Sequence, residues 1–304
     1  MDFFSFQGGF MKQPVFRGVC TALITPFSGD KVNFALLDDL IDFQRENGVS
    51  AVCVCGTTGE SATLSDHEQE AIIAEAVKHQ SNGMTIIAGT GSNNTAHAVE
   101  LSRAANLLGV NAVLAVTPYY NKATSSGIIA HYTAIADAVT CPVILYNVPS
   151  RTGVNIPVEA YKVLAQHPRI AGVKEASGDL VYAMRIQEQT PEDFYIWSGN
   201  DDLIVPMQSI GAMGVISVLS NVYPGETAQL LSNCISGDFD AALQMQLRLS
   251  PMIRALFHEV NPVPAKAAVT MLGFPAGAPR LPLTEATGET KKLLKEYMKK
   301  HGNA

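Results

Sequence analysis

The chain has 304 residues, of which 47% are hydrophobic and 16% are charged, so it can bury a large core and is predicted to be globular. Its formal net charge of −7 argues against nucleic acid and against an anionic membrane surface as partners. The apolar runs are far shorter than the ~20 residues that a membrane-spanning helix needs.

The first 14 residues are predicted to be an N-terminal extension of unknown purpose. Met1–Phe10 contains no lysine or arginine, so it does not resemble a secretory signal. The chain has five cysteines, an odd number, and most of them lie in apolar runs. Buried thiols in a reducing compartment are therefore expected, and the predicted location is the cytoplasm.

Short apolar runs alternate with longer segments of helical period over the first two thirds of the chain. The runs predict eight strands: Val19–Ile24, Ala51–Cys55, Thr85–Ala88, Ala112–Val116, Val143–Tyr146, Ala171–Lys174, Tyr195–Ser198 and Gly214–Ser217. The segments between them predict helices over Ala35–Asn47, Ser65–His79, Thr95–Leu108, Gly127–Val139, Pro157–Gln166, Val181–Gln189 and Asp202–Ile210. Ser65 followed by Glu68 predicts a capping box, and Gly48 and Gly109 are expected to end helices.

This alternation of strand and helix predicts an α/β fold with a parallel sheet. Eight units over about 220 residues match a closed (β/α)8 TIM barrel, and an open doubly wound sheet is the alternative. From about residue 225 onward the sequence predicts consecutive helices. The expected organisation is therefore an extension (1–14), a catalytic barrel domain (15–237) and a C-terminal helical domain (238–304).

Polar residues, glycines and tyrosines follow most of the predicted strands, at the end where barrel enzymes place their active sites. The segments are Gly56–Ser61, Gly89–Asn93, Thr117–Asn121, Tyr146–Gly153, Lys174–Glu175 and Gly199–Asp201. Lys174 ends the apolar run that starts at Ile170, and desolvation there is expected to lower its pKa and to make the amine a nucleophile toward carbonyls. The alternative is a strand-end lysine whose ammonium reaches solvent. Lys266 lies outside the strand ends and is a weaker candidate.

Three further groups could serve a lysine nucleophile. Tyr146 lies one predicted strand from Lys174 and could shuttle protons, although it could also be a core tyrosine. The turn with Thr57 and Thr58 offers hydroxyls and backbone N–H groups to a small carboxylate, although it could be a plain strand-to-helix turn. Arg151 could hold a carboxylate with its planar fork, or form a surface ion pair. The seven histidines are scattered, so no metal site is predicted.

These motifs resemble the dihydrodipicolinate synthase family of Schiff-base aldolases, to which N-acetylneuraminate lyase is related. The resemblance extends from about Gly18 to near the C-terminus. It is carried by Gly56–Ser61, Thr117–Tyr120, Tyr146–Gly153, Gly172–Ala176 and Gly214–Ser217. The run with Arg151 and the paired tyrosines favour the synthase over the lyase.

The resemblance implies condensation of pyruvate with L-aspartate 4-semialdehyde to 4-hydroxy-tetrahydrodipicolinate, in lysine and diaminopimelate synthesis. Lys174 would form the imine with pyruvate. Tyr146 would be the proton shuttle, linked to Thr57 and to Tyr120, and Tyr120 would reach into a neighbouring subunit's site. The family is usually a homotetramer, built as a dimer of dimers.

The resemblance also assigns the substrate contacts. Thr57 and Thr58 would hold the pyruvate carboxylate, and Arg151 would hold the carboxylate of the aldehyde. Ile216 would line the site through its backbone carbonyl. No metal or organic cofactor is implied, because the lysine provides the electron sink.

The resemblance is incomplete at the pocket where some members bind lysine as an inhibitor. The matching residues are Ser61, Ala62, Asn93 and Tyr119. Asp66 and Gln69 stand where those members have two histidines, and His97 stands where they have a glutamate. Loss of that carboxylate removes a partner for the inhibitor's ammonium, so weak or absent inhibition by lysine is predicted.

Two alternatives remain. One is another pyruvate-dependent aldolase acting on a sugar acid, which would present hydroxyls where Arg151 expects a carboxylate. The other is a non-catalytic binding barrel, which would be expected to have lost Lys174 or Tyr146.

Overall fold

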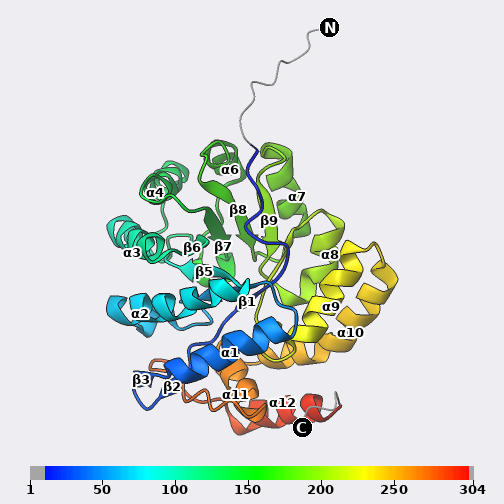
Figure 1. Cartoon of the computed structure of the whole chain (residues 1–304). Helices are drawn as coiled ribbons and strands as arrows, with labels where there is room; N and C mark the ends of the chain where they lie inside the picture. Colours follow the sequence, from blue (N-terminus) through cyan, green and yellow to red (C-terminus); the bar gives the residue numbers. More distant parts are fainter. Residues whose placement is uncertain (1–10, 301–304) are drawn as a thin grey trace, which may run out of the picture.

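The computed structural model describes residues 11–300, and eight parallel strands in it form a closed barrel (Figure 1). The strands are β1 (Gly18–Ala22), β4 (Ala51–Val54), β5 (Thr85–Gly89), β6 (Ala112–Val116), β7 (Val143–Asn147), β8 (Ile170–Glu175), β9 (Tyr195–Ser198) and β10 (Gly214–Ser217). Barrel strands that are consecutive in the amino-acid sequence lie next to one another in the sheet. The ring is closed because β1 pairs with β4 on one side and with β10 on the other. The predicted (β/α)8 barrel is confirmed.

Helices surround the barrel and connect its strands (Figure 1). They are α1 (Phe34–Glu46), α2 (Asp66–Val77), α3 (Thr95–Leu108), α4 (Ser125–Asp137), α6 (Val158–Leu164), α7 (Leu180–Gln189), α8 (Ile204–Ser209) and α9 (Pro224–Ile235). The predicted capping box is present, because Ser65 accepts from the backbone N–H of Glu68 and the Glu68 carboxylate accepts from that of Ser65. Gly109 caps α3 in the left-handed conformation, as expected.

Several short elements were not predicted, among them a hairpin and a one-turn helix. A hairpin of β2 (Phe27–Ser28) and β3 (Lys31–Val32) lies between β1 and α1. A one-turn helix, α5 (Pro149–Thr152), lies within the segment Tyr146–Gly153 at the end of β7. Pro149 starts this helix with its fixed φ, and Gly153 ends it in the left-handed conformation. Elements this short contain too few residues to show a periodic pattern.

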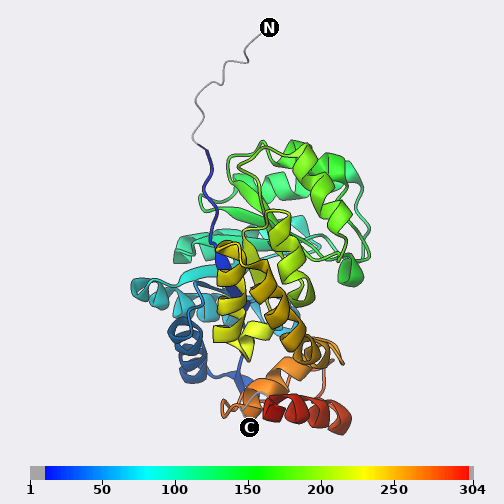
Figure 2. The same ribbon diagram turned by 90° about the vertical axis from the view of Figure 1, so that its right-hand side faces the viewer.

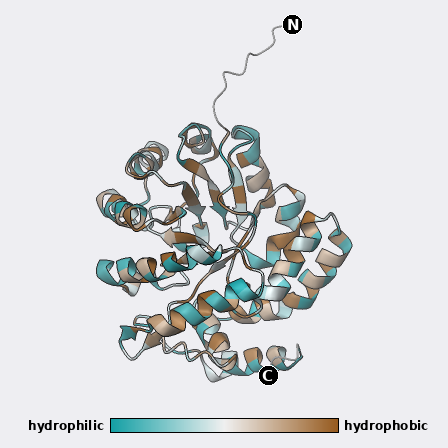
Figure 3. Ribbon diagram, in the orientation of Figure 1, coloured by the Kyte–Doolittle hydropathy of each residue, from teal (hydrophilic) through white to brown (hydrophobic). Residues whose placement is uncertain are grey.

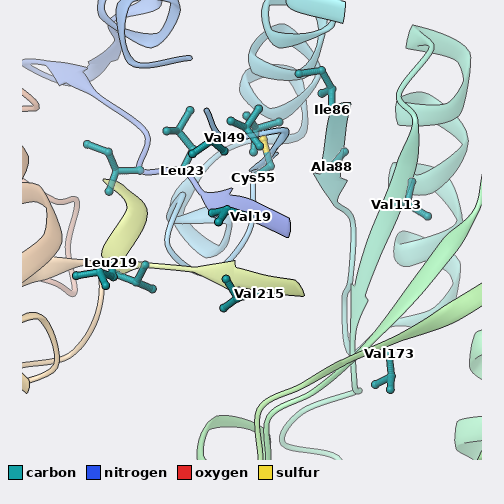
Figure 4. Close-up of a cluster of buried hydrophobic side chains, with 14 of the residues drawn as sticks. Val19, Leu23, Val49, Cys55, Ile86, Ala88, Val113, Val173, Val215 and Leu219 are labelled. Carbon is teal, nitrogen blue, oxygen red and sulfur yellow. The ribbon is translucent and has the colours of Figure 1, made fainter. Parts of the chain in front are cut away.

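The strands bury both of their faces, because successive side chains alternate between the barrel interior and the helix layer. The outward set packs against the helices, and Figure 4 shows part of it, including Val19, Ile86, Val113, Val173 and Val215. The inward set includes Cys20, Ile87, Leu114, Ile144 and Trp197. In Figure 3 the strands are mostly apolar, whereas the surrounding helices alternate between polar and apolar residues.

The segment before β1 lies at the amino-terminal mouth of the barrel. Lys12 donates through Nζ to the carbonyl oxygens of Ala165 and Ile170, at 2.8 and 3.1 Å. Phe16 stacks on Trp197 with ring centroids 5.3 Å apart. The part of the predicted extension that the structure describes is therefore anchored to the barrel, and residues 1–10 lie outside the described residues.

Three helices follow the barrel: α10 (Phe239–Leu256), α11 (Val263–Met271) and α12 (Gly288–Lys300). In Figure 2, α10 lies beside the barrel helices, and α11 and α12 lie together at one end of the molecule. The predicted boundary at residue 237 falls between α9 and α10, and the division into domains stays a prediction. None of the helices in residues 11–300 has both the length and the apolar character needed to cross a membrane.

Candidate active site

Lys174 lies in the barrel interior because of the strand register. It pairs with Tyr146 on β7 and with Trp197 on β9, so all three side chains point to the same side of the sheet. The lysine is only 6% exposed. Its Nζ lies 4.3 Å from the centroid of the Tyr146 ring. Among the described residues, no carboxylate lies within ion-pair distance of this Nζ, so the amine has no charged partner there.

The space around Lys174 depends on a glycine at the end of β9. A Cβ placed on Gly199 would lie 2.5 Å from the Cβ of Ala176 and 3.1 Å from Cε of Lys174. A side chain at this position would therefore displace the lysine or the neighbouring strand end.

A cavity of about 450 Å³ opens at the carboxyl ends of the strands. The predicted residues Lys174, Tyr146, Thr57, Thr58 and Arg151 all line it. They come from three separate segments of the sequence, Gly56–Ser61, Tyr146–Gly153 and Lys174–Glu175. The structure thus brings five of the predicted site residues to one cavity, which is large enough for two small acids.

The turn that carries Thr57 and Thr58 is held from several sides. The N–H of Glu60 bonds to the Thr57 carbonyl at 3.1 Å, and the hydroxyl of Thr25 donates to the Gly59 carbonyl at 2.7 Å. Thr58 itself is buried. These bonds fix the positions of the hydroxyl and amide groups that face the cavity.

Arg151 projects from α5 toward the same cavity. One of its terminal nitrogens, Nη2, donates to the backbone carbonyl of Asn261 at 3.2 Å. No carboxylate of the described residues pairs with this guanidinium, so the surface ion pair considered from the sequence is absent from that part of the chain. The group is therefore able to receive an anion from solution.

Two predicted site residues lie elsewhere. Tyr120 is 89% exposed and has a positive φ of 71°, so its side chain does not contribute to the cavity of its own subunit. Ile216 is buried on β10 within the barrel interior, and its side chain is not part of the cavity wall. Their proposed roles therefore depend on a neighbouring subunit and on a backbone carbonyl.

The cavity wall also contains residues that were not predicted as site residues, among them Asp201, Arg254 and Asn261. Asp201 is buried, and its Oδ2 accepts from the N–H groups of Val218 and Leu219 at 2.9 Å each. Burial raises the pKa of this carboxyl, while these hydrogen bonds and the charge of Lys174 oppose the increase. The position of Asp201 after a predicted strand could have identified it, whereas Arg254 in α10 and Asn261 in the loop before α11 follow no strand and could not be identified in this way.

A second cavity of about 450 Å³ shares a wall with the first. Ser61, Ala62, His97 and Tyr119 line it, and Asn93 donates through Nδ2 to the Tyr119 carbonyl at 3.2 Å. These five residues are the ones assigned from the sequence to an incomplete version of the allosteric pocket in which some family members bind lysine. Asp66 and Gln69 also line this cavity, and His97 Nε2 lies 3.0 Å from Asp66 Oδ1.

Lys266, the weaker lysine candidate, lies away from the first cavity. Its Nζ pairs with Glu60 Oε1 at 2.8 Å, and both side chains are almost fully buried. The same Nζ lies 4.1 Å from the centroid of the Phe27 ring. This amine is committed to an ion pair, which favours Lys174 as the nucleophile.

Comparison with known proteins gives a consistent result over almost the whole chain. Residues 15–301 match the model of the dihydrodipicolinate synthetase family. The 4-hydroxy-tetrahydrodipicolinate synthase of Thermoanaerobacter sp. (strain X514) is 45% identical over 290 residues, which are 95% of this chain and 98% of that protein. The enzyme of the same name from Caldicellulosiruptor saccharolyticus is 47% identical with the same coverage. The crystal structure of dihydrodipicolinate synthase from Aquifex aeolicus gives a TM-score of 0.93 at 42% identity, covering 95% of this chain and 99% of that one.

Proposed function

We propose, since the chain belongs to the dihydrodipicolinate synthetase family, that it condenses pyruvate with L-aspartate 4-semialdehyde to 4-hydroxy-tetrahydrodipicolinate, in lysine and diaminopimelate biosynthesis. The observation that carries the proposal is the environment of Lys174. Its amine is buried at a strand end, has no charged partner among residues 11–300, and lies against Tyr146 in a cavity with two separate places for a carboxylate. Pyruvate and the aldehyde each bring one carboxylate.

The reaction begins at Nζ of Lys174. The amine attacks the ketone carbon of pyruvate, and loss of water leaves an imine. Loss of a methyl proton then gives an enamine, whose carbon forms the new bond to the aldehyde carbon while the aldehyde oxygen takes up a proton, and the imine on Nζ is restored. The amino nitrogen of the aldehyde substrate, after losing its extra proton, attacks this imine carbon, which closes the ring, and the C–Nζ bond breaks to release Lys174 as the free amine. Tyr146, which lies against the amine, carries protons to and from the oxygen that departs as water, with Thr57 as its link.

The two carboxylates are assigned to two different groups in the cavity wall. The turn with Thr57 and Thr58 holds the pyruvate carboxylate, and Arg151 holds that of the aldehyde. The backbone carbonyl of Ile216 completes the pyruvate site. The absence of a carboxylate partner for Arg151 in the described chain supports the synthase over an aldolase for sugar acids, which would need hydroxyl-binding groups in this place.

Borohydride reduction in the presence of pyruvate tests the imine directly. We expect peptide mapping to find the reduced pyruvate adduct on Lys174, and the Lys174→Ala variant to show none. An adduct on Lys266 would contradict the assignment, and a wild-type chain with no adduct would favour the binding barrel. Arg151→Met provides the second test, because it should keep the adduct and lose roughly 100-fold in kcat/KM for the aldehyde, the effect of losing a charged contact of about 3 kcal/mol.

The proposed assembly is a homotetramer built as a dimer of dimers, with Tyr120 entering the neighbouring subunit's site. Its exposure and its positive φ support this, because an exposed tyrosine in a strained conformation needs a reason to be held there. Tyr120→Phe and Lys174→Ala are each expected to be nearly inactive alone. Refolded together, they should regain activity, since a mixed pair has one site with both intact groups. No recovery in a confirmed mixed oligomer would contradict the shared site.

The remaining assignments concern location and organisation. The proposed location is the cytoplasm, which the buried free thiols support, since all five cysteines are unpaired and four of them are buried. The proposed catalytic domain is the barrel (15–237) with a helical domain (238–304) attached. Because Arg254 and Asn261 line the cavity, we assign the helical domain a part in the site.

A further inference from the structure

Asn261 connects the two groups proposed to hold the substrate carboxylates. It lies in the loop between α10 and α11, in the C-terminal helical segment, and is 5% exposed. Its Nδ2 donates to Thr58 Oγ1 at 2.9 Å, and its backbone oxygen accepts from Arg151 Nη2 at 3.2 Å. One residue therefore touches both anion-binding groups.

The other side-chain atom of Asn261 has no partner. Its Oδ1 is buried and accepts no hydrogen bond from any of the described residues. A buried acceptor without a donor costs folding free energy, so such an atom in a cavity wall indicates a ligand donor. Asn261 forms part of the wall of the catalytic cavity, where a bound substrate would supply that donor.

The Asn261 amide can face Thr58 with its nitrogen or with its oxygen. The proposed role of Thr58, which is to donate its hydroxyl proton to a carboxylate, decides between the two. A hydroxyl that receives its hydrogen bond from Asn261 keeps its own proton for a carboxylate oxygen. Nδ2 must then face Thr58, which leaves Oδ1, an acceptor, directed away from it. The free atom is therefore suited to a donor and not to a second carboxylate.

The aldehyde substrate of the proposed reaction has such a donor. L-Aspartate 4-semialdehyde has its ammonium group on the carbon that bears the carboxylate. We propose that Asn261 is a specificity-determining residue, whose Oδ1 accepts a hydrogen bond from the α-ammonium group while Arg151 holds the carboxylate. This inference rests on the proposed function. It adds a group that recognises the α-ammonium, and so distinguishes the amino-acid aldehyde from an aldehyde acid without an amino group.

Asp201 and Asp202 also line the cavity and could attract an ammonium group. Neither has a contact with Arg151, whereas the backbone of Asn261 is bonded to it. Asp201 Oδ2 accepts from two backbone N–H groups, and its Oδ1, like that of Asn261, is buried without a partner among the described residues, so the presence of a free acceptor does not by itself separate the two residues. The ammonium lies one carbon from the carboxylate, so the acceptor beside Arg151 is the one placed to receive it.

The test compares two aldehydes of equal length, of which only one has the ammonium group. KM is measured for L-aspartate 4-semialdehyde, and Ki for succinic semialdehyde as a competitor, in wild type and in Asn261→Ala. In Asn261→Ala we expect KM for L-aspartate 4-semialdehyde to rise roughly tenfold, because one hydrogen bond to a charged group is lost. We expect Ki for succinic semialdehyde to change less than about twofold. Asn200→Ala is the matched control, because Asn200 lines the same cavity without touching Arg151 or Thr58. It should leave the ratio of KM to Ki unchanged.

Equal changes in KM and Ki would overturn the proposal, because Asn261 would then act only by positioning Arg151. No change in either value would overturn it as well. Asn261→Ser is the second variant in case the alanine does not fold, and the same split in the two constants is expected. Borohydride trapping of pyruvate on Lys174 is measured in parallel, and its failure in wild type would refute the proposed function and not the role of Asn261.

Discussion

The buried pair of Lys266 and Glu60 gives the sharpest test of how the C-terminal helices are attached to the active site. Glu60 follows the turn with Thr57 and Thr58, and Lys266 comes from α11, more than 200 residues later in the sequence. The side chains are 2% and 1% exposed, and Nζ lies 2.8 Å from Oε1. We expect Lys266→Met to leave a carboxylate that has lost its buried cation.

The magnitude follows from burial. Removing one partner of a buried ion pair costs about 3–5 kcal/mol, whereas an exposed pair contributes about 0.2–1 kcal/mol. The chain has a matched control in Lys291 and Glu285, whose Nζ and Oε2 are also 2.8 Å apart but whose side chains are 44% and 67% exposed. Lys291→Met should therefore lower the free energy of unfolding much less than Lys266→Met does, because solvent screens the exposed pair.

Urea unfolding followed by circular dichroism and by tryptophan fluorescence measures both variants. The double variant with Glu60→Gln should be more stable than Lys266→Met alone, because the uncompensated charge is removed. Equal losses for Lys266→Met and Lys291→Met would refute the reasoning. So would a double variant that is less stable than the single one. Because Glu60 adjoins the turn, kcat/KM of Lys266→Met should also fall more than that of Lys291→Met.

Three other outcomes are expected. Gly199→Ala should slow trapping of the pyruvate imine roughly tenfold, because its Cβ would crowd Lys174. Gly127→Ala is the control, since a Cβ there would meet only ordinary contacts, and equal trapping rates in the two variants would count against the prediction. Burial lowers the pKa of His131 from 6.5 to about 4, so the unfolded state binds more protons in that window and stability decreases as the pH falls through it. His131→Gln should reduce this dependence in urea unfolding between about pH 7 and pH 5, and an unchanged slope would refute it. Steady-state assays should show no inhibition by lysine in the sub-millimolar range, because His97 stands in the second cavity close to Asp66, and clear inhibition there would overturn that prediction.

The sequence by itself predicted a parallel sheet covered by helices, with a closed barrel favoured over an open doubly wound sheet by the number of strands, and it predicted the pairing at the centre. Eight apolar runs separated by amphipathic segments can bury both strand faces only in a sheet covered by helices. In such a barrel, consecutive strands are neighbours, and alternate residues face inward. The position of Lys174 and Tyr146 near the ends of neighbouring strands was therefore enough to place them together, as the register confirms. Their catalytic roles stay predictions.

Only the tertiary structure decided what the C-terminal helices contribute. Asn261 touches Thr58 and Arg151, which lie 203 and 110 residues before it, and Lys266 pairs with Glu60 across 206 residues. A helix periodicity tells which face is buried but not which surface it packs against. Polar contacts across such a packing interface leave no local pattern, because each depends on two segments meeting in one orientation. The barrel can be predicted from the order of strands and helices along the chain. The part of the cavity wall that the C-terminal segment supplies depends on long-range packing and cannot be predicted in this way.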